Sequence, residues 1–257
     1  EWLPKIASGE ARIAVAMAEM IEARDGAGVT SNGGKLEGTA LFALDFAGAN
    51  AFLVADATGR LHLVPADARG LKKVPLTTID RTRSVGELRF EQVHAEQLAD
   101  DGGATATAAR LRDAGRVILA ADGLGAGQAM IEKAVDYAGQ REQFGRIIGS
   151  FQAVKHMCAE MAARHEPCRS LVWYAAHAFD AAPDEASLAA CQAKSHTGEV
   201  HRFVARTSTE VHGGMGFTDL LGLHYWFKRI GFDRQILGGP EAVRTEAASL
   251  QGWTRAA

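Results

Sequence analysis

The chain has 257 residues, of which 47% are hydrophobic and 23% charged, and its formal net charge is -3. This length and composition suit a globular protein with one large core or two modest ones. The weakly acidic balance gives no electrostatic footprint for nucleic acid or an anionic membrane, and no apolar run approaches the ~20 residues of a membrane-spanning helix. We therefore expect neither a nucleic-acid partner nor membrane insertion.

The three cysteines, Cys158, Cys168 and Cys191, fall in helical patterns and lack a paired CxxC spacing. They are typical of reduced core thiols, which predicts a cytoplasmic protein. Because the first residue is Glu1 rather than Met, we expect the chain to be part of a longer product.

The first part of the chain is expected to form a small β domain, because short apolar or alternating segments are separated by clusters of Gly, Asp and Pro. The polar run Asp100–Gly103 then predicts a hinge, which divides the chain into a β domain over 1–103 and a helical domain over 104–257. The predicted strands are Ala40–Leu44, Ala51–Val54, Arg60–Val64, Leu71–Val74 and Val85–Phe90.

The second part carries apolar residues at helical spacing with short connections, which predicts an antiparallel four-helix bundle. Pro167 lies inside the second long helix, and we expect it to kink that helix. A turn at Pro183-Asp184 precedes a third helix over about Glu185–Thr209, and shorter helices follow Thr218 and Pro240. The fold class is therefore α+β, a small β-sheet or barrel followed by a helical bundle.

The connection between the first two long helices is a candidate phosphate site. Arg141 stands at a helix boundary beside Gly145 and Gly149, whose backbone a ligand can approach closely. An arginine in that setting suits a phosphate or pyrophosphate. The alternative is a surface arginine paired with Glu142 or Glu132, which is common for arginine.

A second candidate loop, His212–Gly216, has three glycines within four residues, whereas a helix C-cap needs only one. It predicts a flat backbone surface suited to a planar group such as adenine. No histidine pair has the HExxH spacing, and no Ser-His-Asp assembly can be inferred, so we predict neither a metal site nor that nucleophile.

Taken together, these segments resemble the acyl-CoA dehydrogenase family. Leu3–Glu10 resembles the lead-in to its β domain, Arg141–Gly145 its RxxFG signature and Gly213–Gly216 its GGxG loop. The resemblance implies FAD, a β domain between helical domains of which the N-terminal one is absent from this chain, and a tetramer with cofactors at subunit interfaces. It also implies a set of contacts to the adenine side of a neighbouring subunit's FAD: Arg141, Gln143, Phe144, Phe151, Glu210, Gly213 and Gly214.

The chain departs from the family where the chemistry occurs. The family removes the acyl α-proton with a glutamate, and its commonest position falls on Leu237 or Gly238. A second position used by some relatives falls on Gly115, so neither position carries an acid.

Donors to the flavin ring are also missing. Ala18 stands where a hydroxyl donor is usual, and Phe42–Leu44 lacks the hydroxyl of the corresponding segment, while Glu210 replaces a glutamine.

This pattern is similar to actinobacterial acyl-CoA dehydrogenases that act on steroid side chains as α2β2 heterotetramers, in which unlike subunits share each FAD. The resemblance implies a subunit that lacks the base, acts on an acyl-CoA together with a second, related subunit, and completes the partner's FAD site. Two alternatives stay open. One is a self-associated catalytic homotetramer with Asp122, two helical turns beyond Gly115, as a displaced base. The other is a flavin-free structural subunit.

Overall fold

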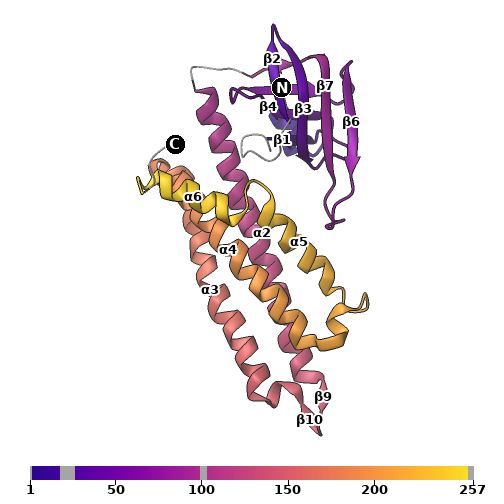
Figure 1. Cartoon of the computed structure of the whole chain (residues 1–257), viewed down its shortest axis with the longest axis vertical. Helices are drawn as coiled ribbons and strands as arrows, with labels where there is room; N and C mark the ends of the chain where they lie inside the picture. Colours follow the sequence, from indigo (N-terminus) through magenta and orange to yellow (C-terminus); the bar gives the residue numbers. More distant parts are fainter. Residues whose placement is uncertain (1, 18–26, 99–102, 254–257) are drawn as a thin grey trace. The chain divides into compact units, whose positions relative to one another are not determined.

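The computed structural model describes residues 2–17, 27–98 and 103–253; the side chains of residues 104 and 105 are not described. Ala18 and the predicted hinge residues Asp100–Gly102 lie outside the described residues. The chain forms two compact units, Glu1–Arg112 and Asp113–Ala257, and each is described by itself (Figure 1). The division at residues 103 and 104 stays a prediction.

The first unit is a mixed sheet preceded by a short helix, α1 (Trp2–Ala7). Its strands are β1 (Ile13–Ala16), β2 (Gly28–Asn32), β3 (Lys35–Leu44), β4 (Ala51–Ala55), β5 (Leu61–Pro65), β6 (Leu71–Leu76), β7 (Val85–His94) and β8 (Glu96–Gln97). Their order is β6-β7-β3-β1-β4-β5-β8, with β2 paired to β3. Among the described strands no pairing closes this order, so the unit is an open sheet and the barrel alternative was wrong.

All five predicted strands are confirmed: β4 and β5 are nearly continuous buried runs, whereas β7 alternates in part between buried and more exposed residues. The prediction missed α1, β1, β2 and β8, which are short. The core contains Val29, Leu36, Phe52, Leu88 and Phe90. Phe42 lies at a register shift between β3 and β7 and has a φ of 53°, so the segment that should carry a hydroxyl is a β-bulge.

The second unit is built on three long helices that follow one another in the chain with short connections (Figure 1). These are α2 (Ala104–Gln140), whose first residues belong to the first unit, α3 (Gln152–Ala181) and α4 (Pro183–His212). Only Ala182 separates α3 from α4, so these two helices turn back on each other. Two shorter helices follow, α5 (Leu223–Gln235) and α6 (Pro240–Leu250), which confirms the helical bundle.

Helix α3 runs unbroken through Pro167. Pro167 lies on the exposed face, where water can bind the carbonyl that loses its helical partner. Helix α4 begins at Pro183, because proline is well suited to the first helical position.

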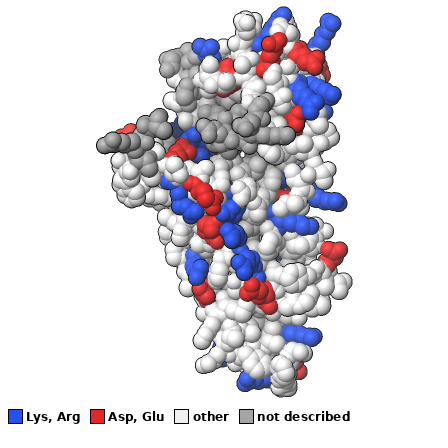
Figure 2. Space-filling view, in the orientation of Figure 1, with Lys and Arg blue, Asp and Glu red and all other residues white. Residues whose placement is uncertain are grey.

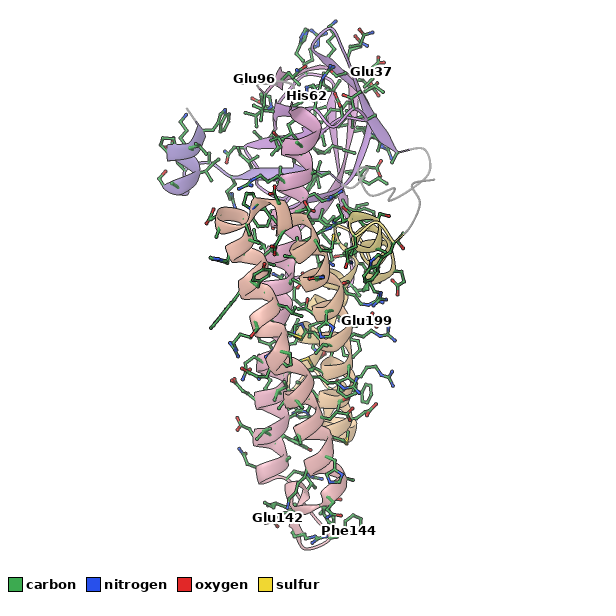
Figure 3. All side chains as sticks on the ribbon, turned by 90° about the vertical axis from the view of Figure 1, so that its left-hand side faces the viewer. Glu37, His62, Glu96, Glu142, Phe144 and Glu199 are labelled. Carbon is green, nitrogen blue, oxygen red and sulfur yellow. The ribbon has the colours of Figure 1, made fainter. Side chains whose placement is uncertain are left out.

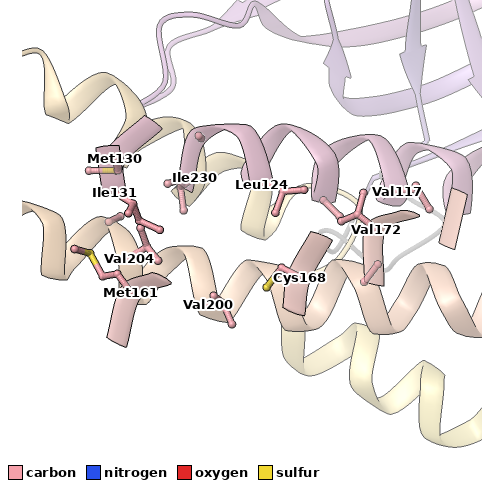
Figure 4. Close-up of a cluster of buried hydrophobic side chains, with 14 of the residues drawn as sticks. Val117, Leu124, Met130, Ile131, Met161, Cys168, Val172, Val200, Val204 and Ile230 are labelled. Carbon is pink, nitrogen blue, oxygen red and sulfur yellow. The ribbon is translucent and has the colours of Figure 1, made fainter. Parts of the chain in front are cut away.

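The core of the helical unit is made mostly of small and branched side chains (Figure 4). Val117, Leu124 and Met130 of α2 pack with Met161 and Cys168 of α3 and with valines of α4. The Ser208 hydroxyl adds a tie between helices by donating to the Met130 carbonyl at 2.8 Å. The core thus fixes the ends of α2 and α4, which carry the two candidate loops.

The solvent face of the helical unit mingles both signs of charge (Figure 2). Arg234 pairs with Glu199 at 2.6 Å and Glu241 at 3.2 Å, and Arg202 approaches Glu199 at 3.7 Å. Ion pairs near the surface contribute little to stability, and the mixture of charges leaves no single-sign field on this face. None of the helices in the described ranges is long and apolar enough to cross a membrane.

Candidate functional site

The connection after α2, for which the sequence predicted only a short turn, is a tight β-hairpin. β9 (Glu142–Gln143) pairs with β10 (Arg146–Ile147) in antiparallel register. The two turn residues, Phe144 and Gly145, have φ values of 54° and 73°. A two-residue turn with both residues left-handed matches the right-handed twist of its strands. The RxxFG signature is therefore a turn with a defined backbone.

Arg141 at the base of this hairpin has a fixed backbone and an exposed side chain. Its N–H donates to the Tyr137 carbonyl at 2.8 Å, and its own carbonyl accepts from Ile148 at 2.7 Å. Within the described ranges no carboxylate pairs with the guanidinium, and Glu132 instead accepts a hydrogen bond from Gln128. The arginine is thus positioned by its backbone and available to bind an anion.

An exposed aromatic ring marks the tip of the hairpin. Phe144 is 92% exposed, and Figure 3 shows it beside Glu142 at the end of the helical unit. Its ring meets Phe151 edge-on at 6.2 Å, and the Arg146 guanidinium lies 3.9 Å from the Phe151 centroid. Phe151 is therefore the packed support of the hairpin, whereas Phe144 offers an uncovered face. Gln143 is exposed and donates to the Glu142 carbonyl.

The glycines of the second loop serve different purposes. Gly213 ends α4 with a φ of 57°, and the 3-10 helix η3 (Gly213–Phe217) follows. A Cβ at Gly216 would lie 2.7 Å from the Thr209 carbonyl oxygen, so packing requires that glycine. A Cβ at Gly213 or Gly214 would meet nothing within 4 Å. Gly214 also lacks a positive φ, so neither backbone conformation nor internal packing accounts for it.

The two loops lie at the same end of the helical unit. Tyr137, one turn before Arg141, stacks against His212, the residue before Gly213, with ring centroids 4.6 Å apart. His212 is buried, and its Nδ1 lies 2.7 Å from the Ser208 carbonyl, to which it donates. Glu210 is exposed, with a long contact of 3.8 Å to Arg206. The predicted contact residues thus share one exposed end.

By resemblance to the family, the catalytic base would fall at Gly115 or at Leu237 and Gly238. Gly115 and Leu237 lie in contact with each other. Leu237 follows α5, and its Cδ1 would lie 2.6 Å from a Cβ added at Gly115 of α2. Leu237 has a φ of 56°, and Gly238 has a φ of 105°. A Cβ at Gly238 would lie 2.8 Å from a Val243 methyl. Leu237 and Gly238 therefore form a packed turn, and Leu237 lies against Gly115 of α2.

Two buried cations hold this turn, and neither was singled out from the sequence. The Arg116 Nε donates to the Leu237 carbonyl at 2.9 Å, and Lys194 Nζ donates to carbonyls of Asp233, Arg234 and Gly238 at 2.6, 2.9 and 3.3 Å. Burial lowers the pKa of Lys194 to about 7. Lys194 directly follows Ala189–Ala193, a run in which every residue but Gln192 is small and apolar. This run could have indicated from the sequence that the lysine is buried.

Arg116 is only 1% exposed but is well compensated. It pairs with Glu246 at 2.8 Å and Asp113 at 3.3 Å, and Asp113 accepts from Ser187 at 2.7 Å. Despite its burial, the Glu246 hydrogen bond and the surrounding negative charges raise the pKa of Arg116. The network joins α2, α4 and α6 around the Leu237 turn.

Asp122 lies on α2 about 10 Å along the helix from Gly115. One of its carboxylate oxygens contacts the Arg229 Nε of α5 at 2.5 Å. The displaced-base alternative at Asp122 stays a prediction. Among the described residues no group of three or more His, Cys, Asp or Glu is arranged to hold a metal ion.

The protein-family model of the acyl-CoA dehydrogenase C-terminal domain matches residues 101–249 of this chain. The acyl-CoA dehydrogenase IpdE2 of Mycobacterium tuberculosis is 35% identical over 169 residues, which are 66% of this chain and 48% of that protein. The caffeyl-CoA reductase-Etf complex subunit CarC of Acetobacterium woodii is 34% identical over 105 residues, 41% of this chain and 27% of the relative. The chain thus spans less than half the length of each of these two relatives.

Among solved structures, a variant of the Tcur3481-Tcur3483 steroid acyl-CoA dehydrogenase superposes with a TM-score of 0.87 at 31% identity, covering 98% of this chain and 70% of that one. Butyryl-CoA dehydrogenase from Megasphaera elsdenii has the same fold, with a TM-score of 0.88 at 21% identity and coverage of 97% and 70%. The family model covers more than half of the sequence, including both candidate loops and the Gly115–Leu237 contact. The chain belongs to the acyl-CoA dehydrogenase family.

Proposed function

We propose that this chain is a subunit of an FAD-dependent acyl-CoA dehydrogenase that lacks the catalytic base and completes the FAD site of an unlike partner subunit. The observation that carries the proposal is the state of the base positions. Gly115 and Leu237 carry no carboxylate and pack on each other, whereas the end that bears Arg141 and Gly213 is open. A chain that can bind the cofactor at an exposed end but carries no catalytic base suits an active site shared with a second subunit.

The open end fits the adenine half of FAD. Arg141 offers the pyrophosphate a guanidinium that no carboxylate of the described residues engages, and a planar fork of donors suits phosphate oxygens. Gly213 and Gly214 leave their backbone uncovered for a planar ring, and Phe144 presents an exposed aromatic ring at the same end of the helical unit. Phe151, Gln143 and Glu210 would support or border this surface.

The reaction requires two groups that must meet at the acyl chain. The chemistry that FAD supplies when bound is acceptance of a hydride from the β-carbon, and a carboxylate must remove the α-proton. This chain offers no carboxylate at Gly115, Leu237 or Gly238. We therefore assign proton removal and the contacts to the flavin ring to the partner subunit, and the hold on the adenine side to Arg141 and the Gly213–Gly216 loop.

The proposed substrate is a bulky acyl-CoA thioester of the sterol side-chain type. Support comes from the likeness to the Tcur3481-Tcur3483 steroid acyl-CoA dehydrogenase, whose name joins two gene products. The relation to CarC, a subunit of a larger complex, also favours an assembly with an unlike partner.

Expression of the chain alone and together with the product of its neighbouring acyl-CoA dehydrogenase gene tests the proposal. We expect flavin absorbance only in the co-purified pair. Stoichiometric flavin on this chain alone would contradict the shared site. A tight but colourless pair would favour the structural subunit instead.

A further inference from the structure

Gly115 and Leu237 do more than lack a carboxylate: the Leu237 side chain lies very close to Gly115. A Cβ at Gly115 would lie 2.6 Å from Leu237 Cδ1, which is closer than real Cβ contacts come. The leucine therefore occupies the space into which any side chain at position 115 would project. A side chain at position 115 would therefore require the Leu237 side chain to move.

The turn that presents Leu237 is held from several sides. Leu237 has a φ of 56°, a left-handed conformation that side chains larger than glycine rarely adopt. The backbone conformation is therefore imposed by contacts. Arg116 binds the Leu237 carbonyl at 2.9 Å, Lys194 binds the Gly238 carbonyl at 3.3 Å, and both cations are at least 98% buried.

The charged network also restricts movement of the turn. Arg116 is fastened to Glu246 of α6 at 2.8 Å and to Asp113 one turn earlier in α2 at 3.3 Å. Displacing Leu237 would leave buried donors of Arg116 or Lys194 without their carbonyl partners, which is unfavourable in a low-dielectric interior. The backbone of the turn is consequently held in place, and the Leu237 side chain projects from it toward Gly115.

We propose that Leu237 is a plug that seals this chain's own thioester position against Gly115. This deepens the proposed function, on which it rests: each pair of unlike subunits then has one acyl-CoA site, and the second position is closed to substrate as well as lacking a base. Leu237 acts as a specificity residue by excluding the acyl chain from this subunit.

A double-mutant cycle tests the contact in the full chain, purified with its partner. Gly115→Ala is expected to lower the unfolding temperature while Leu237 is present, because the new methyl group and Leu237 compete for one space. In the Leu237→Ala background the same change is expected to raise it, because alanine is the better helix former. Gly125→Ala on the same helix is the control: its Cβ would meet nothing within 4 Å, so it should raise the temperature equally in both backgrounds.

Equal effects of Gly115→Ala in the two backgrounds would overturn the plug. If Leu237→Ala fails to fold, Leu237→Gly replaces it, because glycine suits the left-handed turn. The glycine variant thereby removes the leucine side chain without straining the backbone of the turn.

Binding supplies the second readout. Octanoyl-CoA bound to the co-purified pair is measured by anaerobic equilibrium dialysis, and Leu237→Ala is expected to increase the amount bound per pair from one equivalent toward two. Equal binding by the wild-type and variant pairs would overturn the plug. Absence of FAD from the pair would contradict the proposed function separately, because the Gly115–Leu237 cycle does not depend on flavin.

Discussion

Arg141 combines an anchored backbone with a guanidinium that no carboxylate of the described ranges engages. Most surface arginines gain little from an ion pair and lose side-chain entropy in forming one, so a free arginine is unremarkable by itself. Here the hairpin turn and the contact between Tyr137 and His212 place it at one end with Gly213 and Gly214. That arrangement gives the arginine a function to test.

Replacing Arg141 with alanine should weaken FAD binding in the assembled pair. Loss of one charge-assisted hydrogen bond is expected to weaken binding by roughly 1.5–3 kcal/mol. The dissociation constant can be measured from flavin fluorescence during dilution. Arg202→Ala is the matched control, since Arg202 is exposed on α4 and makes only a 3.7 Å contact with Glu199. Equal retention in both variants would count against a role of Arg141 in the site.

Gly214→Ala separates ligand binding from folding. A Cβ at Gly214 meets nothing within 4 Å and the residue has no positive φ, so the unfolding temperature should stay unchanged. If the adenine lies against this backbone, the added methyl group should reduce FAD affinity. Flavin content after gel filtration and thermal unfolding are the two measurements. Loss of both stability and flavin would indicate a structural glycine and contradict the proposed contact.

Helix α2 contains several glycines. The neighbouring side chains that closely approach some of them differ from one position to the next. Gly115 faces Leu237, while Gly123 and Gly127 face buried histidines: a Cβ at Gly127 would lie 2.6 Å from the His201 ring. Glycine inside a helix is unfavourable by about 1 kcal/mol relative to alanine. Close approach of neighbouring side chains explains why α2 keeps these three positions.

The histidine pair inserted against α2 makes stability depend on pH. His165 and His201 are 2% and 1% exposed, their ring centroids are 5.3 Å apart, and their nitrogens have no hydrogen-bond partner in the described part of the chain. Burial lowers the pKa of His201 to about 3, with smaller contributions from His165 and His196. Burial and Arg169 lower the pKa of His165, against an opposing effect of Glu166.

His201→Phe should reduce the acid sensitivity of the helical unit. An unfolded histidine binds a proton near pH 6.5, whereas folded His201 does so only near 3. The neutral ring therefore contributes stability above pH 6.5 that is lost progressively as the pH falls toward 3. Denaturant unfolding at several pH values should show a smaller loss for the variant over this window. Exposed His177→Phe is the control, and an unchanged pH dependence in His201→Phe would contradict this origin.

At the scale of the whole molecule, the proposal predicts a defined stoichiometry. Native mass spectrometry of the co-expressed pair should give two copies of each chain and two FAD, because each cofactor needs the base-bearing subunit on one side and Arg141 on the other. A homotetramer of this chain carrying four FAD would contradict the shared site. It would instead favour the displaced-base alternative, in spite of the Asp122–Arg229 ion pair.

The sequence by itself determined the classes of element, the RxxFG and GGxG signatures and the lack of an acid at Gly115 and Leu237. Strand alternation, helix periodicity and proline at helix starts depend on neighbouring residues, so the sequence records them directly. The hairpin at Phe144-Gly145 was missed because a left-handed phenylalanine is unusual and no local pattern specifies it.

The tertiary structure alone decided which distant residues meet. The contact of Leu237 with Gly115, the burial of Arg116 and Lys194 around it, and the stacking of Tyr137 on His212 all join segments far apart in the chain. Such contacts follow from how the helices pack and cannot be derived from local spacing. That positions 115 and 237 carry no acid could be read from the sequence, whereas the contact of Leu237 with Gly115 became visible only when helix α2 and the turn after α5 were brought together.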